Sequence, residues 1–165
     1  MLAFSFPKSH LEYHGLNPLP VDSLERCSMI PQSVELSVIT QTVLLEAEAE
    51  PYLGKLAVAY TIINRMDKHH LPATYVCWQP WQFSCWLDDL TKISSRFAKA
   101  PQDAWTDSLH AADQAFHKSI PDPTQGATHY LNEELTKQIR GGTLPTWVAS
   151  MTHTVKIGLH DFYKE

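Results

Sequence analysis

Apolar residues recur at helical spacing in three stretches of the chain. The stretches cover residues 31 to about 51, 53 to 68 and 102 to 119, and the first opens on a proline, which suits the first turn of a helix. The positions expected on the buried faces are Val34, Val38, Ile39, Val43 and Leu45, then Leu56, Ala59, Tyr60, Ile63 and Met66, and finally Trp105, Leu109, Ala112 and Phe116. The pattern therefore predicts three amphipathic helices that pack together.

The rest of the chain shows a different pattern. Residues 71 to 86 are rich in tryptophan, lack a clean period and are interpreted as an irregular aromatic loop. A short strand is predicted at 127 to 131, and Val155, Ile157 and Leu159 alternate with polar residues as a half-buried strand does. The predicted fold class is α+β, mainly helical, with a small β element near the C-terminus.

Length and composition favour one domain. The 165 residues, 44% of them hydrophobic, are enough for one core. Residues 1–29 contain three prolines and are expected to be an irregular lead-in, which leaves 30–165 as the folded domain. Cys27, Cys77 and Cys85 are odd in number and lack metal-finger spacing, so buried free thiols are expected, although a bridge between Cys77 and Cys85 stays open.

Charge and hydropathy bear on partners and location. The net charge is −5 and no basic run is present, so nucleic acid is not an expected partner. The longest apolar stretch, residues 56 to 63, is far shorter than the roughly 20 residues that cross a bilayer. The N-terminus lacks the pattern of a secretory signal, so we expect the protein to be made in the cytoplasm. We also expect it to be a monomer.

The segment LLEAEAEPY, residues 44 to 52, places acidic groups where the first apolar stripe has just run. Glu46 follows Thr42 by four residues and Ile39 by seven, so its carboxyl continues the core-facing stripe. Burial favours the neutral form of a carboxyl group, which is what a general acid needs. Glu48 lies on the opposite side of the predicted helix, and Glu50 returns one turn beyond Glu46. A structural carboxylate satisfied by basic or backbone donors is the alternative for Glu46, and a solvent-exposed or supporting residue is the alternative for Glu50.

Four motifs together resemble one known family. They are EAEAEPYLGKLAVAYTIINR at 46–65, QPWQFSCW at 79–86, GATHY at 126–130 and LPTWVASMTHTVKIGLHDFY at 144–163. In the same order they resemble the cell wall hydrolase family typified by the spore cortex-lytic enzymes. The resemblance implies a lysozyme-like or lytic-transglycosylase-like single domain that cleaves the glycan strands of peptidoglycan, with residues 30–165 as the catalytic domain.

The resemblance also implies site residues. The catalytic glutamate of the family matches Glu46, and a second glutamate of its motif matches Glu50. The chain departs from the family pattern at Glu48, where arginine is usual, at Ala49, where glycine is usual, and at Gln125, which replaces a frequent glycine. These departures put in doubt the substrate contacts that the arginine would make.

The family admits two outcomes of glycan cleavage. A hydrolase of the muramidase type needs a second carboxylate across the glycosidic bond. Because Glu46 and Glu50 are expected on one helix, only Asp88 or Asp89 could take that place, and both are expected at the surface. We therefore expect a lytic transglycosylase in which Glu46 alone serves as acid and then as base, with the muramidase as the alternative.

Sugar polymers are bound by aromatic faces and by fixed hydrogen-bonding groups. The candidates for substrate binding are Gln82, Phe83, Ser84, Trp86, Thr128, His129 and Tyr130. Core packing is the alternative for Phe83 and Trp86, and a structural role is equally open for His129 and His160. Asn64 is expected to make a buried hydrogen bond to a neighbouring loop.

Two further function classes stay open. A zinc amidase would also digest cell walls, but the chain has no His-Glu-x-x-His motif, and only His10 and His14 have helical spacing. A noncatalytic wall-binding module is the other class. We expect no metal and no cofactor. Because the chain is short and shows no export signal, a phage endolysin made in the host cytoplasm fits the pattern, and a bacterial enzyme exported by an unrecognised route is the alternative.

Overall fold

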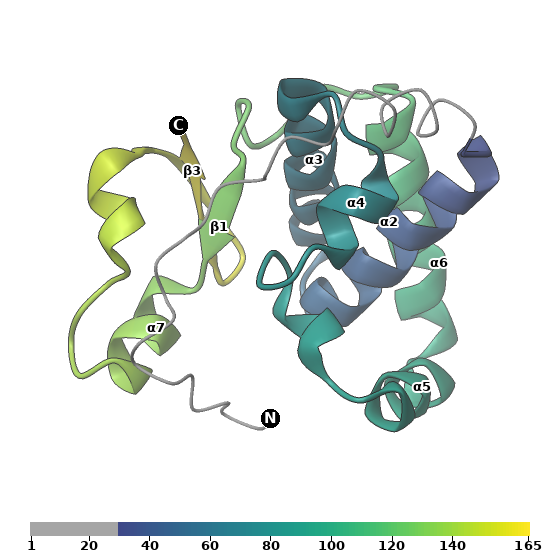
Figure 1. Ribbon diagram of the computed structural model, residues 1–165, viewed down its shortest axis with the longest axis horizontal. Helices are drawn as coiled ribbons and strands as arrows, with labels where there is room; N and C mark the ends of the chain where they lie inside the picture. Colours follow the sequence, from purple (N-terminus) through teal and green to yellow (C-terminus); the bar gives the residue numbers. More distant parts are fainter. Residues whose placement is uncertain (1–29) are drawn as a thin grey trace.

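The computed structural model describes residues 30–165 (Figure 1). The predicted lead-in at 1–29, with Cys27, His10 and His14, lies outside the described residues. Helices gather on one side of the molecule, and a small sheet with its connecting segments lies on the other (Figure 1). The fold is thus mainly helical with a small β element, as the sequence predicts.

The helical part is built on α2 (Gln32–Ala47), α3 (Tyr52–His69) and α6 (Gln102–Phe116), which pack against one another. These are the three predicted helices. A proline in an extended conformation precedes each of them, at Pro31, Pro51 and Pro101. Proline disfavours helical geometry in the residue before it and tolerates the first turn, so each helix has a defined start.

Three details of the predicted helices are wrong, and the first is that Val34, expected on a buried face, is 41% exposed. Helix α2 ends at Ala47, so Glu50 lies in the turn to α3 and not on the first helix. Leu109 is exposed, because α6 buries a different face. That face is made of small residues, which let the helices approach closely: Ala104, Ser108, Ala111, Ala112 and Ala115.

The region predicted as an irregular aromatic loop contains short helices. Helix α4 (Ala73–Trp78) and the 3-10 helix η1 (Ser84–Leu87) both fall within residues 71–86, and α5 (Leu90–Lys99) follows. The Glu35 carboxylate accepts the backbone N–H of Ala73 at 2.5 Å and so begins α4. The residues between α4 and η1 form a turn, and this is the part of the prediction that is confirmed.

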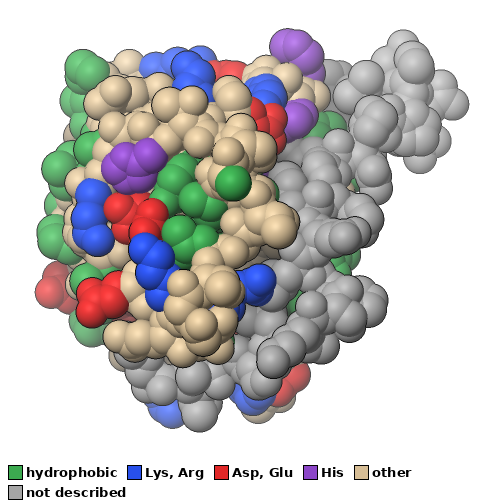
Figure 2. Space-filling model, turned by 90° about the vertical axis from the view of Figure 1, so that its left-hand side faces the viewer, with side chains coloured by type: hydrophobic (Ala, Val, Ile, Leu, Met, Phe, Trp, Pro, Cys, Tyr) green, Lys and Arg blue, Asp and Glu red, His purple; other side chains and the backbone are tan. Residues whose placement is uncertain are grey.

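The sheet has three antiparallel strands in the order β1-β3-β2. Strand β1 (His129–Leu131) falls in the predicted segment, and β2 (Thr152–Ile157) and β3 (His160–Lys164) form a hairpin. The single strand predicted through Leu159 is wrong, because Gly158, at φ +59°, turns the chain and leaves Leu159 exposed. Helix α7 (Glu133–Ile139) and the 3-10 helix η2 (Thr146–Ser150) connect β1 to β2. Charged and histidine side chains surround a small apolar area on this side of the molecule (Figure 2).

Buried side chains join the sheet to the helices. Phe162 of β3 is fully buried and packs in a cluster with Ala57 of α3. The Asn64 amide of α3 donates to the carbonyl oxygen of Ala127 at 2.9 Å and to Asp122 at 3.0 Å, which confirms its predicted bond to a neighbouring loop. No helix within residues 30–165 combines the length and apolar character that a membrane span requires.

Candidate active site

The Glu46 carboxylate lies in the last turn of α2, half-buried, between the aromatic loop and β1. Its Oε1 accepts the backbone N–H of Cys85 at 2.9 Å and the Ser84 hydroxyl at 3.3 Å. Its Oε2 accepts the Tyr130 hydroxyl at 3.2 Å. Three donors from two distant segments therefore fix the orientation of a carboxyl group that still reaches solvent.

Tyr130 is held as a hydrogen-bond donor. Its ring packs among aromatic side chains, with ring centroids 4.9 Å from His160, 5.6 Å from Phe162 and 6.5 Å from Phe83. Burial, with the charge of Glu46 beside it, raises the pKa of the Tyr130 hydroxyl well above its usual value. The hydroxyl therefore keeps its proton near neutral pH and continues to donate to Glu46.

Arg65 connects the aromatic loop to the segment that leads into β1. This buried side chain donates from Nε to the carbonyl oxygen of Thr128 at 2.5 Å and from Nη1 to Gln82 at 3.4 Å. Its guanidinium lies 4.9 Å from the centre of the Phe83 ring, a cation–π distance. Both segments that bind Glu46 are thus fixed to the same residue of α3.

The thiols near the site are unreactive. Cys77 and Cys85 are free and buried, so the predicted free thiols are confirmed for these two residues and no bridge joins them. Burial raises the pKa of Cys77 to about 12, and burial with the adjacent Glu46 charge raises that of Cys85 further. Because the thiolate is the nucleophile, neither cysteine is suited to covalent catalysis.

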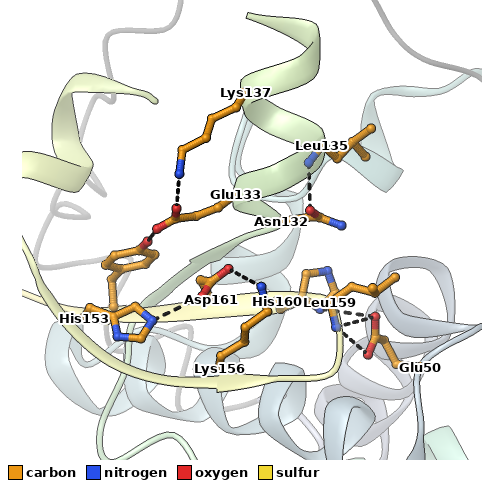
Figure 3. Close-up of polar contacts among 11 residues, drawn as sticks. Glu50, Asn132, Glu133, Leu135, Lys137, His153, Lys156, Leu159, His160 and Asp161 are labelled. Carbon is orange, nitrogen blue, oxygen red and sulfur yellow. Dashed lines mark hydrogen bonds and ion pairs between the residues drawn. The ribbon is translucent and has the colours of Figure 1, made fainter. Parts of the chain in front are cut away.

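Glu50 joins the helices to the hairpin turn (Figure 3). Both of its carboxylate oxygens lie 3.3 Å from the backbone N of Leu159 and accept its N–H, and its Oε1 is 4.0 Å from Nδ1 of His160. The side chain is only 7% exposed, and a Cβ added to Gly158 would lie 1.8 Å from its Oε2. Glycine at 158 therefore makes room for the carboxylate as well as allowing the positive φ of the turn.

This contact sets the surroundings of Tyr130. The hairpin turn is followed at once by His160, whose ring lies edge-on to Tyr130. Burial lowers the pKa of His160, while the negative charges of Glu50 and Glu46 act in the opposite direction. Glu50 thus binds the turn that precedes His160, and His160 in turn packs against Tyr130.

Comparison with known proteins identifies the family. The sequence profile described as Cell Wall Hydrolase matches residues 49–163. The chain belongs to the Cell Wall Hydrolase family. The matched region begins three residues after Glu46 and includes Glu50, η1, Tyr130 and nearly all of the sheet, so the case for Glu46 itself depends on the geometry described above.

Named relatives agree with this membership. The spore cortex-lytic enzyme of Halalkalibacterium halodurans is 26% identical over 145 residues, and that of Bacillus cereus is 26% identical over 132 residues. These alignments cover 85% and 79% of this chain but only 38% and 44% of the relatives. The chain therefore spans less than half the length of the curated relatives it matches.

Solved catalytic domains share the fold. The catalytic domain of the Bacillus cereus SleB protein is 25% identical, with a TM-score of 0.59, and the alignment covers 80% of this chain and 91% of that domain. The catalytic domain of the germination-specific lytic transglycosylase SleB from Bacillus anthracis is also 25% identical, with a TM-score of 0.58, covering 82% and 98% respectively. The fold predicted from the four motifs is confirmed by these matches.

This cell wall hydrolase brings only some of the predicted site residues together. Ser84 and Tyr130 bind Glu46, and Gln82 is half-buried beside Arg65. Trp86 is half-buried and donates from Nε1 to Thr42 at 3.0 Å, on the core side of the loop.

Three of the predicted substrate contacts lie inside the protein. Phe83, Thr128 and His129 are each at most 5% exposed. Phe83 belongs to the hydrophobic core, which was the alternative for it, and the His129 ring packs 5.3 Å from that of Trp147. As placed, these side chains support the site from within and present no face to a glycan.

The remaining candidates have structural partners. Asp89 caps α5 by accepting the N–H of Lys92, and Asp88 pairs with the Lys92 ammonium at 3.6 Å. Within residues 30–165 no three His, Cys, Asp or Glu side chains gather as metal ligands. Sequence reasoning missed the Cys85 N–H, because any residue supplies a backbone amide, and it missed the role of Arg65 in joining the two segments.

Proposed function

We propose that this protein is a peptidoglycan lytic transglycosylase that cleaves the bond between N-acetylmuramic acid and N-acetylglucosamine with Glu46 as its catalytic acid and base. The observation that carries the proposal is the Glu46 carboxyl, half-exposed and oriented by the Cys85 N–H and the Ser84 and Tyr130 hydroxyls. Membership of the Cell Wall Hydrolase family and the likeness to SleB catalytic domains support the choice of substrate.

The chemistry needs one carboxyl group acting twice. In the first step the Glu46 carboxyl gives its proton to the glycosidic oxygen, and the bond from that oxygen to C1 of the muramoyl residue breaks. In the second step the Glu46 carboxylate takes the proton of the muramoyl 6-hydroxyl, and O6 forms a bond to C1. The products are a strand with a free 4-hydroxyl and a 1,6-anhydro-muramoyl end, so no water is consumed.

The positions of the other carboxylates favour this scheme over hydrolysis. A hydrolase with two carboxyl groups needs the second one across the bond, about 5 to 9.5 Å from the first depending on stereochemistry. Glu50 is engaged with the turn at Leu159, and Asp89 caps α5. The carboxylates that the sequence offers as a second acid are thus bound elsewhere.

The test is mass spectrometry of the soluble products released from purified peptidoglycan. Wild type, Glu46→Gln and Glu134→Gln are compared, the last as a matched control because it makes the same change at an exposed carboxylate of α7. We expect 1,6-anhydro-muramoyl ends from wild type and Glu134→Gln, and a loss of at least about 100-fold in Glu46→Gln. Circular dichroism and urea unfolding check that the variants are folded.

Other products would lead to different conclusions. Reducing muramoyl ends that disappear in Glu46→Gln would make the protein a muramidase, with a positioned water in place of the 6-hydroxyl. Free stem peptides would make it an amidase and refute glycan cleavage. Full activity of a folded Glu46→Gln would remove Glu46 from the reaction.

A further inference from the structure

The aromatic loop contains a tryptophan in a backbone conformation that favours glycine. Trp81 has φ +70°, and the N–H of Gln82 donates to the carbonyl oxygen of Gln79 at 3.2 Å, which closes a four-residue turn. Proline at 80 locks the second position near φ −65°, so the turn is type II, whose third position requires positive φ. A bulky residue there is a genuine outlier.

Packing does not account for this residue. The Trp81 side chain is 59% exposed, so its indole projects largely into solvent from the tip of the turn. Trp78, at the end of α4 on the same loop, is also 51% exposed. Strained residues kept without a packing reason are found most often at functional sites.

The loop that carries Trp81 is part of the active site. Ser84 and Cys85 on this loop bind the Glu46 carboxylate, and Gln82 is bound to Arg65. Trp81 lies four positions before Cys85 in the chain, so their Cα atoms lie within about 15 Å of each other. A glycan strand bound at Glu46 can cover that distance with a few sugars.

We propose that the Trp81 indole is a stacking surface for a sugar ring of the bound glycan strand, in a subsite beside Glu46. This proposal rests on the glycan-cleaving function proposed above. The apolar C–H face of a pyranose ring suits an exposed indole, and an aromatic side chain gives a large contact with little loss of conformational freedom. The left-handed backbone conformation at Trp81 directs the indole toward solvent. A glycine at position 81 would adopt the same conformation but would offer no surface for the sugar ring.

The test measures binding and stability together. All binding variants carry Glu46→Gln, so that the strand is not cut, and the probe is peptidoglycan glycan strands stripped of their stem peptides. Trp81→Gly is compared with Trp81→Tyr, which keeps an aromatic face, and with His70→Gly. His70 is the matched control, because it is an exposed residue with positive φ at the end of α3, outside the loop.

We expect Trp81→Gly to raise the dissociation constant about 3- to 10-fold, and Trp81→Tyr to restore most of the affinity. Both glycine variants should raise the urea midpoint, because each relieves a left-handed residue, and only Trp81→Gly should weaken binding. A residue with a purely structural role would not lose affinity while the protein gains stability. In the cleaving enzyme, Trp81→Gly should raise KM and leave kcat nearly unchanged.

Unchanged affinity of Trp81→Gly for the stripped strands would overturn the proposal. The proposal would also be overturned if Trp81→Gly weakened binding to whole peptidoglycan but not to the stripped strands, because the indole would then contact the stem peptide. The two proposals fail separately. If whole peptidoglycan yields only free stem peptides but Trp81→Gly weakens binding to the stripped strands, the glycan-cleaving function fails and the subsite stands.

Discussion

Gly158→Ala tests whether Glu50 positions the hairpin beside the active site. A methyl group at this position would lie 1.8 Å from Oε2 of Glu50, so the carboxylate must move from its bonds to the Leu159 N–H. Gly141→Ala is the matched control, since Gly141 has a similar φ of +65° and a Cβ there meets nothing within 4 Å. The comparison separates the cost of the backbone conformation from the cost of displacing Glu50.

The magnitudes follow from these two terms. Alanine in a left-handed conformation costs about 1–2 kcal/mol, and this applies to both variants. Losing a hydrogen bond to a buried charged group costs about 1.5–3 kcal/mol more, and this applies only at Gly158. We therefore expect Gly158→Ala to lower the free energy of unfolding by about 2 kcal/mol more than Gly141→Ala. Because β3 begins just after the turn and carries His160 against Tyr130, activity should fall about 10- to 100-fold in Gly158→Ala alone.

The assay is urea unfolding of both variants, with product release from peptidoglycan as the functional measurement. A double-mutant cycle with Glu50→Ala completes it. Without the carboxylate, Gly158→Ala should cost only the backbone term and resemble Gly141→Ala. Equal destabilisation of the two single variants, or a Gly158→Ala cost that persists in the Glu50→Ala background, would refute the positioning role of Glu50.

Two further predictions concern the groups around Glu46 and the stability in acid. Tyr130→Phe should lower kcat about 10-fold, because it removes a hydrogen-bond donor to Glu46, and the urea midpoint should change little. An unchanged kcat would contradict a role of this hydrogen bond in the reaction. Burial, with the positive charge of Arg65 nearby, lowers the pKa of His129 to about 3, below its value in the unfolded chain. The stability that depends on a neutral His129 is therefore complete above about pH 6.5 and is lost as the pH falls toward 3, at up to about 1.4 kcal/mol per pH unit. Urea titrations at pH 7 and 5 should show a smaller loss in His129→Gln than in wild type, and equal losses would show that another group is responsible.

The long helices could be predicted because each has an apolar stripe and a proline at its start. Helix α7 could not, since it buries no residue and so has no stripe to detect. Its start is marked only by the Asn132 side chain, which accepts the N–H of Leu135 at 2.9 Å. Asp89 caps α5 in the same way. Capping residues were thus an available signal for α5 and α7, two of the helices that the sequence analysis missed.

A site residue could be predicted where its side-chain type and its spacing to nearby residues in the sequence indicate its role. Glu46 continues the stripe of α2, and its half-buried position agrees with that reasoning. Glu50 was placed wrongly because the stripe was extended beyond Ala47, where the helix stops. Its contact with Leu159 joins residues 109 positions apart, and no local pattern encodes a bond of that kind.

The geometry at Glu46 depends on two buried charged side chains outside the reaction. Arg65 and Glu50 are 5% and 7% exposed, and burying such groups costs more free energy than apolar packing would. A contribution to folding stability does not explain why these two charged side chains are buried, whereas the segments that they hold in place do. Arg65 holds the aromatic loop and the approach to β1 together, and Glu50 holds the hairpin that carries His160 against Tyr130. The donors to Glu46 come from segments far apart in the chain. The orientation of its carboxyl group therefore depends on both the Arg65 contacts and the Glu50 contact, and the loss of either should lower kcat even where the protein stays folded.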